Sequence, residues 1–169
     1  ESDALRMKNE FIKFKNFESV VGGNLIISRL KALSVPKLPS RKRILFTMQG
    51  IGLPDFIEEA INLNSDYIWH FRMHPRFQAE KKLVEMLEKK YPGCVEIESA
   101  NKLSIYELLV CVNYHITAFS GSAIEAQCFG VQNIIYSEKG LTAYKEQIES
   151  MSYFFVKNSD QLRDILQNE

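Results

Sequence analysis

The sequence of 169 residues predicts an α/β fold, a Rossmann-like doubly wound parallel sheet of about six strands with helices on both faces. From residue 43 onward, short runs of β-branched and aromatic residues alternate with amphipathic runs of helical spacing, which is typical of this class. Crossovers of this length are right-handed and make successive strands parallel. We therefore expect the doubly wound strand order 3-2-1-4-5-6.

The strands are recognised as short apolar runs and the helices by their periodicity and their end signals. We expect strands at residues 43–48, 66–73, 95–97, within 110–119, at 132–136 and at 153–156. We expect helices at residues 54–64, 78–91, 104–109, 122–129, 142–150 and 159–167. Pro54 suits a first helical turn, and Pro92-Gly93 and Gly130 end the helices before them.

Residues 1–42 differ in pattern and are expected to form a leader helix and an interdomain linker ahead of a Rossmann-like domain at 43–169. Apolar spacing predicts a short amphipathic helix over 3–15 and a second helix over 25–33. Two prolines, Pro36 and Pro39, make 34–42 a linker. Leu5 and three phenylalanines of the leader can cover an apolar face or mediate a homodimer. The start at Glu1 suggests a piece of a longer protein.

Composition excludes several classes of protein. With 46% hydrophobic and 25% charged residues, the chain is not disordered overall, and no apolar run approaches a membrane span. The 21 basic and 21 acidic residues cancel, which argues against a nucleic-acid binder. Residues 1–43 hold 10 basic and 4 acidic side chains, which we interpret as a solvated leader. Contact with another domain, or peripheral association with an anionic membrane, is the alternative.

Metal chemistry and disulfides are not expected. The three cysteines Cys94, Cys111 and Cys128 are odd in number and lack metal-ligand spacing. Each lies among apolar residues, which suits a buried thiol in the reducing cytoplasm.

Unusual residues follow the first two strands, at the edge where such sheets bind ligands. The first strand leads into Gln49-Gly50-Ile51-Gly52, where glycines allow close approach and free amides attract phosphate. A plain turn is the alternative. The second strand leads into Arg72-Met73-His74-Pro75-Arg76, where His74 can donate to a phosphate oxygen between two arginines. The alternative is that His74 caps the next helix or packs inside the protein. His70 and His115, inside strands, are expected to be structural.

Further polar residues follow the fourth and fifth strands. Ser120-Gly121-Ser122 opens a helix whose first amides and hydroxyls suit an anion, and Glu125 can accept hydrogen bonds from a ribose diol. Ordinary capping by Ser122 is the alternative, and a nucleophilic serine is disfavoured because the string is not GxSxG. Lys139, in the loop expected after the fifth strand, either meets a phosphate or is solvated.

These residues resemble a known family. Over residues 103–135, a short helix, a strand, the Ser-Gly-Ser turn and the helix with Glu125 follow the order seen in the nucleotide-binding, C-terminal half of GT-B-fold glycosyltransferases. His74-Pro75 looks like the HP motif of bacterial sialyltransferases, polysialyltransferases and related capsule polysaccharide enzymes. Ser120 and Ser122 are similar to the serine pair of those enzymes, although a glycine separates them here. The resemblance covers roughly residues 20–169.

The resemblance implies a glycosyltransferase, cytoplasmic or peripheral to the inner membrane face, that uses a nucleotide sugar and a glycan acceptor. It favours a CMP-sugar over a UDP-sugar, and it makes His74 the group that contacts, and as general acid protonates, the departing phosphate. No metal is expected, since no DxD occurs. The acceptor site and the catalytic base belong to the N-terminal GT-B half, which this chain lacks, so the chain is expected to be an incomplete enzyme.

Two alternatives stay open. A UDP-sugar transferase or UDP-sugar 2-epimerase of the same fold would share the Ser/Gly turn and the glutamate-bearing helix. A non-catalytic Rossmann-like binding or scaffolding domain is the alternative from another class, since a fold does not set a function.

Overall fold

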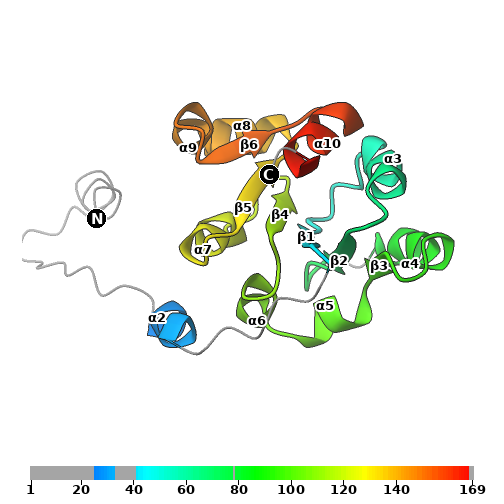
Figure 1. Ribbon diagram of the computed structural model, residues 1–169, viewed down its shortest axis with the longest axis horizontal. Coiled ribbons are helices and arrows are strands. Elements are labelled where there is room, and N and C mark those ends of the chain that lie inside the picture. Colours follow the sequence, from blue (N-terminus) through cyan, green and yellow to red (C-terminus); the bar gives the residue numbers. More distant parts are fainter. Residues whose placement is uncertain (1–24, 33–40, 78, 168–169) are drawn as a thin grey trace, which may run out of the picture.

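A six-stranded, all-parallel sheet forms the centre of the computed structural model, which describes residues 25–32, 41–77 and 79–167. The strand order is β3-β2-β1-β4-β5-β6, so the expected doubly wound order is confirmed (Figure 1). The strands are β1 (Arg43–Thr47), β2 (Ile68–Arg72), β3 (Val95–Glu96), β4 (Tyr114–Thr117), β5 (Gln132–Ile135) and β6 (Tyr153–Phe155). The inner strands are buried on both faces, as parallel strands under helices require.

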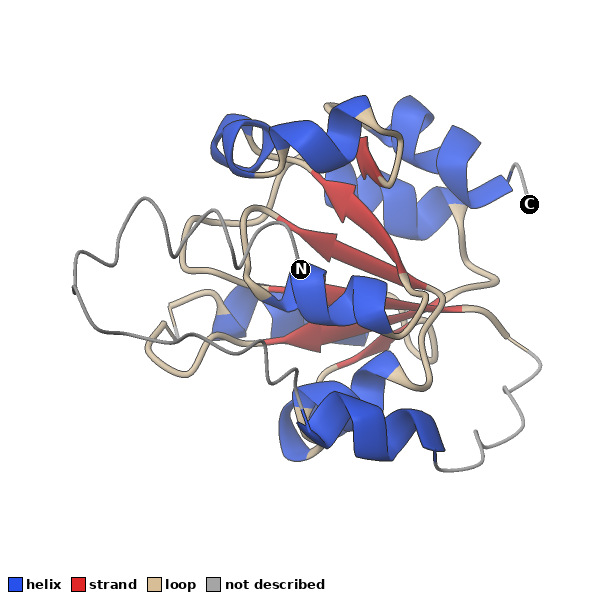
Figure 2. Ribbon diagram, turned by 90° about the vertical axis from the view of Figure 1, so that its left-hand side faces the viewer, coloured by secondary structure: helices blue, strands red, loops and turns tan. Residues whose placement is uncertain are grey.

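Helices cover both faces of this sheet, as Figure 2 shows. They are α2 (Leu25–Ala32), α3 (Phe56–Leu63), α4 (Lys81–Lys90), α5 (Glu98–Lys102), α6 (Ile105–Leu109), α7 (Ser122–Cys128), α8 (Glu138–Ala143), α9 (Lys145–Glu149) and α10 (Ser159–Gln167). Side chains of α3, α4 and α10 pack on one face in a core with Phe46 and Trp69. Side chains of α6, α7 and α9 pack on the other, around Leu45 and Ile135. Among the described residues, no helix is long and apolar enough to cross a bilayer.

Most expected elements are confirmed, and α2 matches the second helix expected in the leader. The helix expected at 3–15 lies outside the described residues, and so do residues 34–40 of the linker expected at 34–42. One short helix, α5, was not expected, because its five residues are too few to show a period.

The single helix expected at 142–150 is wrong. Two helices, α8 and α9, stand there instead, and α8 begins at Glu138 because Ser137 accepts a hydrogen bond from the Gly140 amide as its N-cap. Lys139 is therefore in the first turn of a helix and not in a loop. Gly140 fits inside α8 because its Cα lies against the Ala118 carbonyl, where an added Cβ would come within 1.9 Å of the oxygen.

The sheet register brings three connecting loops to one edge. Thr47, the last residue of β1, pairs with Arg72 of β2 on one side and with Thr117 of β4 on the other. The strand order reverses between β1 and β4, so the loops after β1, β2 and β4 meet at the switch point of the fold.

Candidate functional site

The glycine loop after β1 binds the carboxylate of a side chain from the same protein, Glu80. Gly50 and Gly52 both have positive φ, at 75° and 86°, a conformation that favours glycine. Their amides donate to the carboxylate of Glu80, at 3.2 Å and 2.5 Å. Glu80 is buried, and it lies immediately before α4. The expectation that these amides are free is therefore wrong, because an anionic side chain already occupies them.

The loop after β2 lies directly against this glycine loop. Phe77 covers Gly50 so closely that an added Cβ would lie 2.5 Å from the Phe77 Cγ. The Phe77 amide donates to the His74 carbonyl at 3.0 Å, and the two rings lie 4.8 Å apart. The structure thus brings the His-Pro turn and the Gly50 loop together through Phe77.

The ring of His74 has a defined orientation. Its Nδ1 accepts a hydrogen bond from the Arg76 amide at 3.1 Å. A neutral ring bound in this way carries its proton on Nε2, which can donate to a ligand oxygen. His74 is partly exposed, whereas Pro75 and Arg76 are exposed.

Arg72 is engaged within the protein. Its Nη1 donates to the carbonyls of Ala100 and Leu103, at 2.7 Å and 2.6 Å, and so fixes the connection between α5 and α6. Burial lowers the pKa of Arg72. The contacts that the structure shows for Arg72 are therefore structural.

The Ser-Gly-Ser turn after β4 is held to the β1 loop. Gln49 Oε1 accepts from the Phe119 amide at 2.8 Å, which connects the two loops across the switch point. Ser122, the first residue of α7, has its Oγ 2.8 Å from the Ser120 Oγ, and the residue before α7 is Gly121. Tyr144 donates to the Ser120 carbonyl at 2.5 Å. The structure therefore places Gln49 beside the serine pair.

A buried histidine that sequence reasoning left as structural contacts this pair. His115 of β4 is fully buried, with its Nε2 3.2 Å from the Ser122 Oγ and 3.0 Å from the Thr47 Oγ1. Its Nδ1 lies 2.8 Å from the Asn133 Oδ1. Burial, opposed by the Asn133 hydrogen bond, lowers the pKa of His115 from 6.5 to about 4. His115 is therefore neutral at physiological pH.

Two more predicted residues border the same turn. Glu125 lies one turn into α7, where Tyr106 of α6 donates to its carboxylate at 2.8 Å. Lys139, although helical, has its ammonium 4.6 Å from the centre of the Phe119 ring. Glu125 thus lies in the helix that the serine pair opens, and Lys139 lies beside the residue before that pair.

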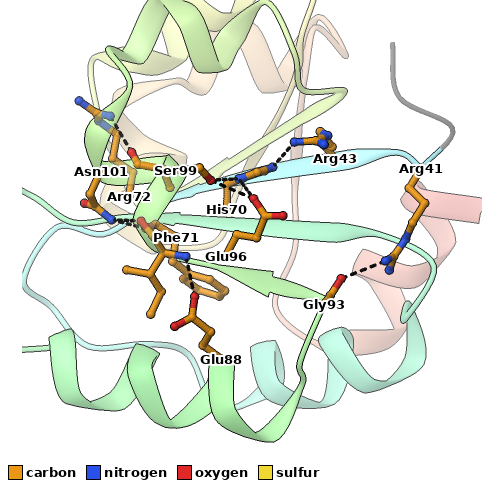
Figure 3. Close-up of polar contacts among 12 residues, drawn as sticks. Arg41, Arg43, His70, Phe71, Arg72, Glu88, Gly93, Glu96, Ser99 and Asn101 are labelled. Atoms are coloured by element: carbon orange, nitrogen blue, oxygen red, sulfur yellow. Dashed lines mark hydrogen bonds and ion pairs between the residues drawn. The ribbon is translucent and has the colours of Figure 1, made fainter.

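His70 belongs to a separate buried cluster, shown in Figure 3. Arg43 Nη1 lies 3.1 Å from its Nε2, and Glu96 and Ser99 each lie 3.4 Å from its Nδ1. Burial lowers the pKa of His70, while Glu96 opposes that shift. His70 is 2% exposed and lies in mid-strand, as its structural interpretation predicts.

A groove of about 620 Å³ lies between the end of β2, its following loop, and helices α4 and α5. Its walls come from α4 and α5 and carry charges of both signs, including Lys81, Glu85, Glu98 and Lys102. Pro75 borders this groove. Mixed charge gives the groove no preference for an anion. Among residues 25–32, 41–77 and 79–167, no three His, Cys, Asp or Glu side chains are grouped to hold a metal ion.

Comparison with known proteins finds similarity at the level of structure. No protein-family model and no curated protein sequence matches the chain. The C-terminal CMP-Kdo binding domain of WaaA from Acinetobacter baumannii superposes with a TM-score of 0.52 at 13% identity, covering 74% of this chain and 78% of that one. A putative UDP-N-acetylglucosamine 2-epimerase from Listeria monocytogenes gives 0.58 at 17% identity over 90% of this chain. The wall teichoic acid polymerase TagF, soaked with CDPG, gives 0.54 at 17% identity over 84%.

This chain has the fold of a GT-B C-terminal domain. The GT-B C-terminal fold is what the residues 103–135 and the His-Pro pair led us to expect. At these low identities the similarity establishes the fold alone. The chain spans 78% of the WaaA domain, but only 40% of the epimerase chain and 36% of the polymerase chain.

Proposed function

We propose that this chain is the donor-binding domain of a glycosyltransferase and that it holds the nucleotide phosphate of an activated sugar. The observation that carries the proposal is that three loops adjoin at the switch point of a GT-B C-terminal fold. The His74 loop contacts Gly50 through Phe77, and Gln49 accepts from the Phe119 amide just before the Ser120–Ser122 turn. Solved structures with this fold include a CMP-Kdo binding domain, which supports a nucleotide-sugar ligand.

The chemistry of these residues suits a departing phosphate. Negative charge builds on the nucleotide as the sugar leaves, and fixed donors aimed at that charge lower the barrier. The Nε2–H of His74 and a hydroxyl of the serine pair are such donors. To act as general acid, His74 would first take a second proton on Nδ1, which would replace its hydrogen bond from the Arg76 amide. Lys139 adds positive charge beside Phe119. Because the Gly50 and Gly52 amides already donate to the Glu80 carboxylate, we assign the phosphate to His74 and the serine pair.

The donor we favour is a CMP-sugar of the sialic acid kind, used without a metal in surface or capsule polysaccharide synthesis. The reason is the resemblance of His74-Pro75 and the serine pair to the motifs of sialyltransferase-like enzymes. We further propose that an N-terminal GT-B half supplies the acceptor site and the catalytic base, and that the reaction occurs in the cytoplasm or at the inner face of the membrane.

A second candidate is an enzyme that acts on a UDP-sugar, either a transferase or a 2-epimerase. The similarity to the Listeria monocytogenes epimerase structure favours it, since that match covers 90% of this chain. A preference of the protein for UDP over CMP would select this candidate.

The test is a titration of the full chain with CMP, UDP and inorganic phosphate, followed through backbone amide chemical shifts. We expect CMP to shift Gly50, His74 and the residues from Ser120 to Glu125. The His74→Ala variant should lose these shifts, and Lys82→Ala, on an exposed position of α4, should keep them. Shifts confined to the α4–α5 groove, or no response at millimolar nucleotide, would contradict the proposal and favour a non-catalytic binding domain.

A further inference from the structure

The hydrogen-bond pattern around His115 determines which of its ring nitrogens carries the proton. The Asn133 Nδ2 lies 2.8 Å from the carbonyl of Ala123, which can only accept, so the amide group must stand with Nδ2 on that side. Its Oδ1 therefore faces the His115 Nδ1 at 2.8 Å and accepts a hydrogen bond from it. The neutral ring consequently has its proton on Nδ1, and Nε2 is an acceptor with one lone pair.

Two hydroxyls compete for that single lone pair. The Thr47 Oγ1 lies 3.0 Å from Nε2 and the Ser122 Oγ lies 3.2 Å from it. Thr47 is 6% exposed, and its hydroxyl has no other hydrogen-bond partner within residues 41–77 and 79–167. A buried hydroxyl without a partner is costly, so Thr47 is the donor to Nε2.

The proton of Ser122 is then directed outward, to Ser120. The Ser122 Oγ donates to the Ser120 Oγ at 2.8 Å, and the Ser122 amide donates to the same oxygen at 3.3 Å. These two bonds use both lone pairs of the Ser120 oxygen. Only its own O–H remains, and Ser120 is partly exposed at the switch point. Ser120 can therefore donate to a ligand but cannot accept from one.

We propose that His115 is a positioning residue that, through Thr47, Ser122 and the fixed ring tautomer, makes Ser120 a hydrogen-bond donor toward a ligand oxygen that only accepts. A non-bridging phosphate oxygen is such an atom, whereas a sugar or ribose hydroxyl would need an acceptor as well. The inference rests on the proposed function, because it assigns the nucleotide phosphate to Ser120. It deepens that function by giving the site a preference for phosphate at this position.

The critical test changes Thr47, which is buried behind the site and does not touch the ligand in this scheme. Thr47→Val keeps the shape and removes the hydroxyl, so Ser122 can turn its proton to Nε2 and accept from Ser120. The donor aimed at the phosphate is then lost. We expect about tenfold weaker binding of CMP or UDP, since a hydrogen bond to a charged group contributes about 1.4 kcal/mol or more. Thr47→Ser restores a hydroxyl and should recover most of the affinity.

Two measurements distinguish this role from simple loss of structure. Side-chain ¹H–¹⁵N spectra of the unliganded protein should show His115 protonated on Nδ1 and not on Nε2. Binding of the nucleosides cytidine and uridine, which lack phosphate, should not differ between the Val and Ser variants. Recovery by Thr47→Ser together with the Nδ1 tautomer supports the inference.

The results that would overturn the positioning role differ from the result that would overturn the proposed function. A proton on Nε2, or equal CMP and UDP affinities for wild type and Thr47→Val, would overturn the positioning role and leave the proposed function intact. If wild type binds neither CMP nor UDP, the proposed function itself is overturned, and the inference that rests on it is overturned too.

Discussion

The buried ring of His115 makes the free energy of unfolding depend on pH. In the folded protein, burial lowers the pKa of His115 from 6.5 to about 4. In the unfolded chain the ring is exposed and keeps its ordinary pKa, so the unfolded state binds a proton first as the pH falls. The stability that comes from a neutral buried ring is therefore complete above about pH 6.5 and is lost progressively toward about pH 4.

The size of this effect follows from the pKa difference. Each unit of pKa corresponds to about 1.4 kcal/mol, so a fall from 6.5 to about 4 gives roughly 3 kcal/mol in all. Between about pH 7 and pH 5, the part that is lost is about 2 kcal/mol. This is a large fraction of the stability of a domain of this size, which is on the order of 10 kcal/mol.

The measurement is urea unfolding at both pH values for wild type and for His115→Gln, which has no titrating ring. We expect His115→Gln to be less stable at pH 7 but to lose about 2 kcal/mol less than wild type on acidification. His70, whose pKa is also lowered, remains in both proteins and cancels in the comparison. Equal losses in the two proteins would refute the argument.

Three further predictions concern the loops around the site. In urea unfolding, Gly50→Ala should lower the free energy of unfolding by about 2 kcal/mol or more, because the new Cβ meets Phe77 and the backbone has positive φ. Gly52→Ala has positive φ but open space around it, so it should lower that free energy by about 1 kcal/mol. Arg72→Lys should lower the free energy of unfolding by about 1–3 kcal/mol, because the hydrogen bonds to the Ala100 and Leu103 carbonyls are weakened. It should also speed amide hydrogen exchange across α5 and α6. Unchanged exchange there would contradict this. Glu80→Gln should speed exchange of the Gly50 and Gly52 amides, and unchanged rates would show that the carboxylate charge does not hold the loop.

Local pattern was enough to predict most of the sheet. The strands expected at residues 43–48 and 132–136 are found as β1 at Arg43–Thr47 and β5 at Gln132–Ile135. Strands buried on both faces must be apolar along their whole length, so they are visible in the sequence without knowledge of their neighbours. The regular alternation of strand and helix then predicted right-handed crossovers and parallel strands. The order 3-2-1-4-5-6 was expected as a common doubly wound order, and the structure confirms it.

Short helices and their starts were less visible. The pattern around Lys139 predicts a loop, yet α8 begins at Glu138 because Ser137 caps it and because Gly140 can pack against Ala118 of the β4 loop. That contact spans 22 residues of sequence, so no local period reports it. The break between α8 and α9 at Tyr144 coincides with the contact of its hydroxyl with the Ser120 carbonyl.

The sequence by itself determined the fold class and the loops in which His74 and the serine pair lie, because each depends on local periodicity. It predicted the strand order only as the common one for this class, and the structure established that order. Only the tertiary structure decided that Glu80 occupies the amides of a glycine loop 28 to 30 residues away. It alone placed Asn133 and Thr47 on either side of His115, since β4 pairs with both β1 and β5. The physical reason is that hydrogen-bond partners are selected by distance in space, and the sequence reports only neighbours along the chain.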